Sequence, residues 1–203
     1  VYSEQYPTVQ GNEDFVASIN ERHYERVKGY IEEARLAGTR IEALCPAGEE
    51  FSAPSDHKIA LHLIVGPDDS LACMQDEIFG PVLNIKTYSK LDEVLDYINE
   101  RERPLALYYF GDDVQEQRRV IAETISGGVS VNAIGLHVAC DDLPFGGTGH
   151  SGMGNYRGFD GFKTFSHARS VYQEGRVNLP KVAGTLPPYG QKVEKLMASQ
   201  IKK

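Results

Sequence analysis

The sequence predicts an α/β fold in which a mostly parallel sheet is flanked by helices. Segments with the period of amphipathic helices alternate along residues 20–132 with short apolar segments typical of strands. The chain has 203 residues, 41% of them hydrophobic, which is enough to bury a core without a disulfide or metal ion. Residues 133–165 are Gly-rich and irregular, so we expect loops there.

Three helices are predicted from apolar periodicity. The first spans residues 20–38, ends at Gly38, and buries Tyr24, Val27, Tyr30, Ile31 and Ala34. The second follows Ser89, with Asp92 in a capping-box position, and buries Leu91, Val94, Leu95 and Ile98. The third begins at Asp112 or Asp113, ends at Gly127-Gly128, and points Val114, Ile121 and Ile125 inward.

Five segments have the length and composition of strands, at residues 40–44, 58–65, 81–88, 105–110 and 129–132. The alternation in 58–65 places Ile59, Leu61, Leu63 and Val65 on its buried face. The run 105–110 is continuously apolar, which is typical of a strand covered on both faces. Residues 45–57 have the composition of a loop, and 166–173 are expected to form one more strand.

Charge and cysteine content narrow the classes of partner. The net charge of −8 argues against binding to nucleic acid or to an anionic membrane surface, and no apolar run approaches ~20 residues. The three cysteines are widely spaced, which suits a reducing, cytoplasmic location. We expect Cys45 and Cys73 to be buried and inert and Cys140 to line a surface loop.

Two apparent motifs are rejected. Residues 147–152 spell G-x-G-x-x-G, but the strand and helix that a dinucleotide fingerprint requires do not flank them. The glycines are instead expected to permit tight turns or close backbone approach. His137, Cys140 and His150 fit no known metal-ligand spacing, so no metal site is predicted.

Residues 76–81, Asp-Glu-Ile-Phe-Gly-Pro, are more informative and leave two readings open. In one, they are a polar strand end with Phe79 in the core. In the other, a carboxylate hydrogen-bonds a sugar diol while the aromatic ring packs on a flat heterocycle.

Residues 74–81 (MQDEIFGP) resemble the cofactor-contacting motif of the aldehyde dehydrogenase superfamily. The resemblance continues in order through 105–108 (LALY), 126–132 (SGGVSVN), 143–147 (LPFGG), 151–154 (SGMG) and 164–167 (TFSH). The resemblance covers nearly all of residues 1–175. The LALY and TFSH segments are similar to those of the branch that includes class 3 and coniferyl aldehyde dehydrogenases.

The resemblance implies part of a catalytic domain over residues 1–165, an oligomerisation strand over 166–177 and a tail over 178–203. The family oxidises aldehydes to carboxylic acids with NAD or NADP through a cysteine thioester. Its nucleophile lies in a G-Q-x-C context that this chain lacks, so no catalytic residue is assigned here. We therefore expect a C-terminal fragment, a view that the first residue, Val1, also favours.

Residue by residue, the resemblance assigns Glu77 to the nicotinamide ribose and Phe79 to the nicotinamide ring. It places Asn132, His137 and Phe145 at the aldehyde pocket. Three departures from the family pattern are Asp76, His62 and the acidic loop 133–142.

Two other functions remain open. One is a stand-alone assembly module of the same fold that catalyses nothing. The other is action on an acyl-CoA or a phosphorylated semialdehyde, which the LALY and TFSH variants disfavour. The expected partners are a small aldehyde and a second copy of the chain in a homodimer.

Overall fold

The computed structural model describes residues 1–49 and 56–201. Residues 50–55 of the predicted loop at 45–57 therefore lie outside the described residues. The chain divides into two compact units, Val1–Tyr97 and Ile98–Lys203, each of which is described by itself.

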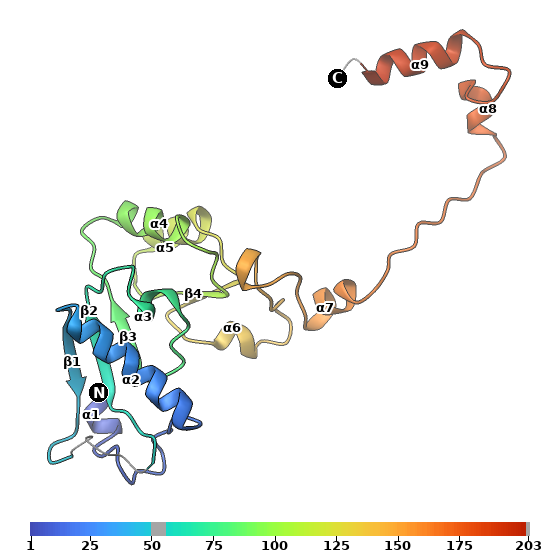
Figure 1. Cartoon of the computed structure of the whole chain (residues 1–203). Coiled ribbons are helices and arrows are strands. Elements are labelled where there is room, and N and C mark those ends of the chain that lie inside the picture. The colour runs from blue at the N-terminus through green and yellow to red at the C-terminus, as the bar shows by residue number, and fades with distance from the viewer. Residues whose placement is uncertain (50–55, 202–203) are drawn as a thin grey trace. The chain divides into compact units, whose positions relative to one another are not determined.

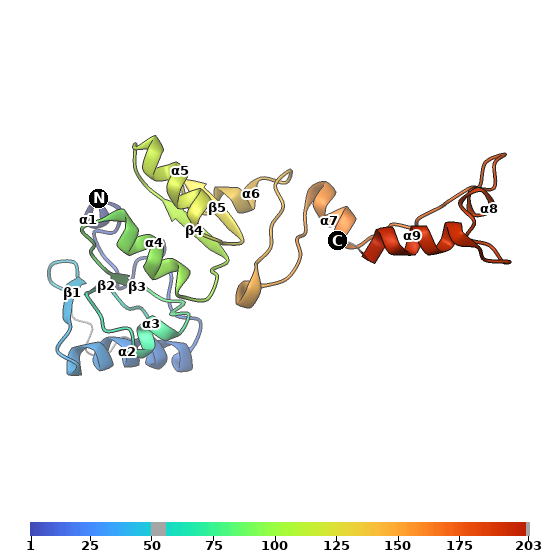
Figure 2. The ribbon, with the colours of Figure 1, turned by 90° about the horizontal axis from the view of Figure 1, so that it is seen from above.

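The first unit contains a three-stranded sheet with a long helix on one face. Its elements are α1 (Tyr2–Gln5), α2 (Glu21–Leu36), β1 (Arg40–Leu44), β2 (Leu61–Val65), α3 (Ala72–Gln75), β3 (Val82–Ile85) and most of α4 (Leu91–Asn99). The strand order is β1-β2-β3, with β1 antiparallel and β3 parallel to β2. Figures 1 and 2 show α2 lying along this sheet.

Helix α2 confirms the first predicted helix in detail. Asn20 caps it, because its side chain accepts a hydrogen bond from the His23 backbone N–H, and Gly38 beyond its end has a φ of +75°. Its buried residues are Tyr24, Val27, Tyr30, Ile31 and Ala34, the five that were predicted. They pack with Ile59, Ile64, Leu71, Cys73 and Val82 in one core cluster.

Strand β2 corrects a prediction about which face is buried. The ladder is shorter than predicted, beginning at Leu61, and its fully buried residue is Ile64, which has no exposed surface. Of the four residues predicted to be buried, Ile59 before the strand is buried, whereas Leu61, Leu63 and Val65, on the face opposite to Ile64, are only half-buried. Both faces of this strand carry apolar side chains, and α2 covers the face that carries Ile64.

Helix α4 buries Leu95 and half-buries Leu91, Val94 and Ile98, as predicted. The start of α4 differs from the predicted capping box in one contact. The Ser89 backbone N–H donates to the Glu93 carboxylate at 3.0 Å, whereas the prediction placed Asp92 in that role.

The second unit begins with a parallel pair of strands, β4 (Ala106–Tyr109) and β5 (Gly128–Val131), joined through α5 (Val114–Glu123). Two of the three strand pairings in the described residues are thus parallel, which agrees with the predicted sheet type. Asp113 caps α5, since its carboxylate accepts from the Gln115 and Glu116 backbone N–H groups.

Burial in this unit differs from the prediction. Leu105, Tyr108 and Phe110 are 41–59% exposed, so the described residues do not cover β4 on both faces. In α5 the buried residue is Val120, followed by Thr124 at the C-terminal cap, whereas Val114 and Ile121 share an exposed face. The helix also ends at Glu123, so Gly127-Gly128 is not its cap and Ile125 lies beyond it.

The predicted irregular region contains three short helical turns, α6 (Leu136–Ala139), η1 (Gly149–Ser151) and α7 (Gly158–Thr164). Residues 167–175 form neither helix nor strand in the described chain, and the predicted oligomerisation strand there stays a prediction. The tail contains α8 (Leu179–Ala183) and α9 (Gln191–Ile201). Among the residues described, no helix is both long and apolar enough to cross a bilayer.

Candidate functional site

The turn between α3 and β3 carries the two residues assigned to a cofactor. Phe79 has a φ of +49°, a strained conformation for an aromatic residue, and its side chain is 82% exposed. The reading that places Phe79 in the core is therefore wrong. Glu77 is also exposed, and the bond that it makes to Arg26 uses its backbone carbonyl, which leaves the carboxylate to solvent.

The turn lies directly against α2. A Cβ atom built on Gly80 would approach Val27 Cγ2 to 2.7 Å, so only glycine lets the backbone pack this closely on the helix. The close contact explains why the residue after Phe79 has no side chain.

An open cavity of about 1080 Å³ lies beside this turn. Its lining includes Phe15, Val16, Ile19, His23, Arg26, Glu77 and Phe79. An exposed ring and a free carboxylate at the edge of an apolar cavity are the groups that would hold a flat heterocycle and a sugar diol. The residues present therefore fit a nicotinamide cofactor.

The residues assigned to the aldehyde pocket lie in the second unit. Asn132 directly follows β5 with a φ of +52°, and its side chain holds the backbone just after β4: Oδ1 accepts from the Gly111 N–H at 2.9 Å and Nδ2 donates to the Gly111 carbonyl at 3.1 Å. In this structure Asn132 therefore fixes where the following loop departs.

His137 is buried on α6 and only 8% exposed. Its Nδ1 lies 2.8 Å from Ser130 Oγ on β5, and its Nε2 is buried without a hydrogen-bond partner among the described residues. The ring lies over Gly128, where a Cβ would approach His137 Cδ2 to 2.6 Å. Its centroid is 6.2 Å from that of Phe145, so the structure brings these two predicted residues together.

Phe145 forms an aromatic cluster that sequence reasoning missed. It pairs with Tyr156 through two backbone hydrogen bonds of 3.0 and 2.9 Å, and the rings are perpendicular at 5.4 Å. The Arg157 guanidinium lies over both rings, at 5.6 and 5.8 Å from their centroids. The Asn-Tyr-Arg sequence at residues 155–157, between two glycines, is the sequence feature that could have indicated this cluster.

The glycine loop behaves as the sequence predicted. A Cβ on Gly146 would approach the Gly154 carbonyl oxygen to 2.0 Å, and one on Gly147 would approach the Ser151 carbonyl oxygen equally closely. These glycines permit close backbone approach, and η1 is only three residues long. Within the described part of the chain, His137, Cys140 and His150 form no group that could hold a metal.

The three cysteines are free. Cys73 is buried and Cys140 exposed, as predicted, whereas Cys45 is exposed, so its predicted burial is wrong. Loss of hydration raises the pKa of the Cys73 thiol, and so does nearby Glu33. The pKa of the Cys45 thiol is raised in the same way, with Glu49 adding to the effect. Both thiols are held in the protonated, weakly nucleophilic form.

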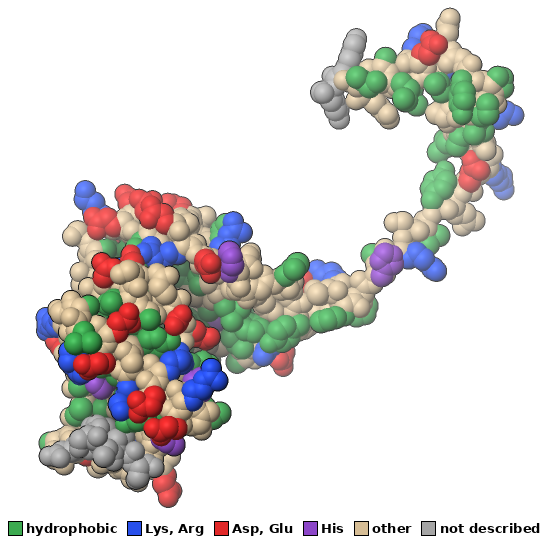
Figure 3. Space-filling model, in the orientation of Figure 1, with side chains coloured by type: hydrophobic (Ala, Val, Ile, Leu, Met, Phe, Trp, Pro, Cys, Tyr) green, Lys and Arg blue, Asp and Glu red, His purple; other side chains and the backbone are tan. Residues whose placement is uncertain are grey.

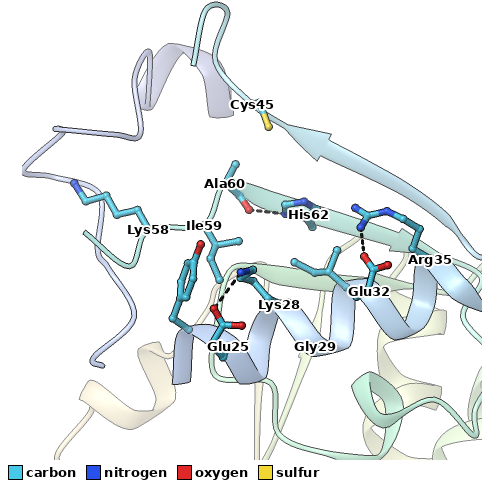
Figure 4. A pocket seen from close by; sticks show the side chains of 12 residues that line it. Glu25, Lys28, Gly29, Glu32, Arg35, Cys45, Lys58, Ile59, Ala60 and His62 are labelled. Carbon is cyan, nitrogen blue, oxygen red and sulfur yellow. Dashed lines mark hydrogen bonds and ion pairs between the residues drawn. The ribbon is translucent and has the colours of Figure 1, made fainter. Parts of the chain in front are cut away.

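A second cavity, of about 500 Å³, lies between α2 and the β2 face that carries His62 (Figure 4). His62 is half-buried, and its Nδ1 lies 2.7 Å from the Ala60 carbonyl oxygen. Burial lowers the pKa of His62, and the positive charge of Arg35 lowers it further. The family departure at this position is thus an imidazole packed beside α2, where burial disfavours its protonated form.

We expect this histidine to make the first unit less stable in acid. An unfolded His62 titrates near ~6.5, and the folded one resists protonation. The free energy of unfolding should therefore fall as the pH drops from about 6.5 toward the depressed folded pKa. The protection of the β1 and β2 amides against hydrogen exchange, at about pH 7.5 and about pH 5.5, measures this change in the free energy of unfolding. His62→Gln should reduce the difference in protection between the two pH values. An equal difference in the wild type and in His62→Gln would show that His62 is not the cause of the acid sensitivity.

Comparison with known proteins agrees with these features. The model of the aldehyde dehydrogenase family matches residues 6–171. A probable coniferyl aldehyde dehydrogenase of Caulobacter vibrioides is 48% identical over 99% of this chain and 41% of its own length. The coniferyl aldehyde dehydrogenase of a Pseudomonas species is 43% identical over 95% and 40%. The dimeric NADP-preferring aldehyde dehydrogenase of rat is 40% identical over 86% and 36%.

Solved structures show the same relationship. The substrate-bound AldH of Staphylococcus aureus superposes with a TM-score of 0.73 at 34% identity, over 97% of this chain and 42% of that one. An aldehyde dehydrogenase of Mycobacterium tuberculosis complexed with NAD⁺ gives 0.67 at 26% identity, over 81% and 33%. The chain spans about two fifths of the length of the curated relatives it matches. With its cofactor-type turn and this match over most of its length, the chain belongs to the aldehyde dehydrogenase family.

Proposed function

We propose that the chain is the C-terminal portion of an NAD(P)-dependent aldehyde dehydrogenase that oxidises an aromatic or hydrophobic aldehyde, such as coniferyl aldehyde, to its acid. The exposed pair Glu77 and Phe79, held beside an open cavity, is the observation that carries the proposal. The names of the relatives support the substrate class.

In this oxidation a hydride would pass from the aldehyde carbon to the bound cofactor, water would supply the second oxygen of the acid, and one proton would be released. Glu77 would accept hydrogen bonds from the nicotinamide ribose, and Phe79 would lie against the nicotinamide ring. Phe145 and Tyr156 offer ring surfaces against which an aromatic aldehyde could pack.

The nucleophile of the thioester step would lie outside this chain. None of the three cysteines stands in a G-Q-x-C context, and the raised pKa values of Cys45 and Cys73 disfavour a thiolate at either. Large apolar side chains of the second unit are exposed to solvent, including Phe159 at 71% and Phe162 at 66%. Their exposure supports the proposal that further protein covers this surface in the intact enzyme. Figure 3 shows hydrophobic side chains gathered near α7.

We expect the 203-residue chain to form no NADH or NADPH with coniferyl aldehyde, because the nucleophile is missing. The intact protein, meaning the product of the complete reading frame that encodes this chain, should reduce the cofactor. Absorbance at the nicotinamide band measures both. Turnover by the chain alone would contradict the assignment of the nucleophile. An intact protein that oxidises no aldehyde would favour the assembly-module alternative.

We also expect residues 166–177 to drive self-association into a dimer. Val171 and Tyr172 are 78% and 74% exposed, and residues 167–175 make no strand pairing in the described chain, so their backbone groups are open to a partner strand. Sedimentation should find the full chain and a version ending at Asn178 associated at tens of micromolar, and a version ending at Phe165 monomeric. A finding that all three versions are monomeric would contradict the expectation.

A further inference from the structure

Arg26 on α2 makes a fork onto the turn that carries Glu77 and Phe79. Its Nη1 donates to the Glu77 carbonyl oxygen at 3.0 Å, and its Nη2 donates to the Ile78 carbonyl oxygen at 2.7 Å. These are the two peptide groups immediately before the strained residue Phe79. The planar guanidinium therefore fixes two successive peptide planes at once.

The guanidinium is itself held in place. Its Cζ lies 5.3 Å from the centroid of the Tyr30 ring, and its Nη1 also donates to Tyr30 Oη at 2.7 Å. Tyr30 is 5% exposed and donates its hydroxyl proton to Asp76 Oδ2 at 2.9 Å. Asp76 begins the turn, so the contacts run from α2 to both ends of the segment that precedes Phe79.

We propose that Arg26 is a positioning residue for the cofactor contacts, an inference that rests on the proposed function of Glu77 and Phe79. A positive φ at an aromatic residue persists only where its surroundings enforce it. Without the fork, the two peptide planes before Phe79 can rotate, and the φ of Phe79 relaxes toward negative values. This change redirects both the Phe79 ring and the Glu77 carboxylate. Arg26 touches no reacting atom in this role and acts only through the turn.

Arg26→Lys tests the inference because lysine keeps the charge but cannot bridge two carbonyl groups in a plane. In the 203-residue chain we expect the backbone order parameters of Ile78, Phe79 and Gly80 to fall from rigid values toward those of a flexible loop. In the intact protein we expect the KM for the cofactor to rise and hydride transfer to slow, each by about tenfold, with the KM for aldehyde unchanged.

Two variants complete the design. Arg35→Lys is the matched control, since Arg35 lies on the same helix, pairs with Glu32 at the surface, and should change neither readout. Tyr30→Phe keeps the ring beside Arg26 and removes the hydrogen bonds that the hydroxyl makes to Arg26 and Asp76, but it leaves the fork itself in place, so it should give a smaller change in the same direction. It also serves if Arg26→Lys does not fold.

Unchanged order parameters at Phe79 in Arg26→Lys would overturn the inference. So would unchanged cofactor kinetics in Arg26→Lys combined with slower hydride transfer in Glu77→Gln, which would leave the proposed function standing. Loss of order at the turn with unchanged kinetics in both variants would support the fork as the clamp of the turn and overturn the proposed function instead.

Discussion

Replacing Glu77 by Gln in the intact protein is expected to slow hydride transfer by about 10²-fold while leaving the fold intact. A carboxylate can accept two charge-assisted hydrogen bonds from a ribose diol, each contributing about 1.5–3 kcal/mol. Glutamine keeps the shape but loses the charge, so the nicotinamide is held less firmly. A displacement of about 1 Å at the reacting centre costs on the order of 10²-fold in rate.

The rate constant of a single turnover, with enzyme in excess over aldehyde, measures this step directly. Because the Glu77 side chain is exposed, the substitution should change the free energy of unfolding by no more than about 0.5 kcal/mol. Glu13→Gln, at another exposed glutamate of the first unit, is the matched control. A wild-type rate in Glu77→Gln would leave that carboxylate with no part in holding the cofactor.

Gly147→Ala is expected to open the loop that joins Phe145 to Tyr156. The new Cβ would lie 2.0 Å from the Ser151 carbonyl oxygen and 2.2 Å from its carbon, and backbone atoms cannot move aside as a flexible side chain can. Opening the loop breaks the hydrogen bonds between Thr148 and Ser151 that close η1. We expect a cost of about 3 kcal/mol, at the upper end for overpacking.

Amide hydrogen exchange reports this loss, because the Phe145 and Tyr156 N–H groups are hydrogen-bonded to each other's carbonyls in the native loop. Both should exchange faster in Gly147→Ala. Gly175→Ala is the control, since its Cβ would meet nothing within 4 Å. Native protection of both amides in Gly147→Ala would show that the loop accommodates a methyl group.

Helix α2, strand β1 and the type of sheet were predictable because local signals agree with one another there. The helical spacing of Tyr24, Val27 and Ile31, together with Asn20 and Gly38 at the ends, specifies one helix with one buried face. The close approach of the glycine backbones was predictable for a similar reason, since the flanking sequence excludes the alternative fingerprint.

Burial was less predictable wherever two faces of an element are similar. Strand β2 carries apolar side chains on both faces, and the packing of α2 decides that Ile64 is the buried one. In α5, Val114 and Ile121 have the spacing of an inward face, yet Val120 is buried, because burial depends on which neighbours the chain provides. Periodicity locates a face but does not identify what covers it.

The motif at residues 76–81 and the pocket residues show the same division. The sequence by itself determined the family-type motif and the residue types that can hold a diol and a ring. Only the tertiary structure decided that Phe79 is exposed at positive φ, that Arg26 clamps the carbonyls before it, and that Tyr156 and Arg157 join Phe145. Arg26 lies 51 residues from Glu77 in the chain. A contact over that separation depends on how α2 packs against β3 and its preceding turn, which no local pattern encodes.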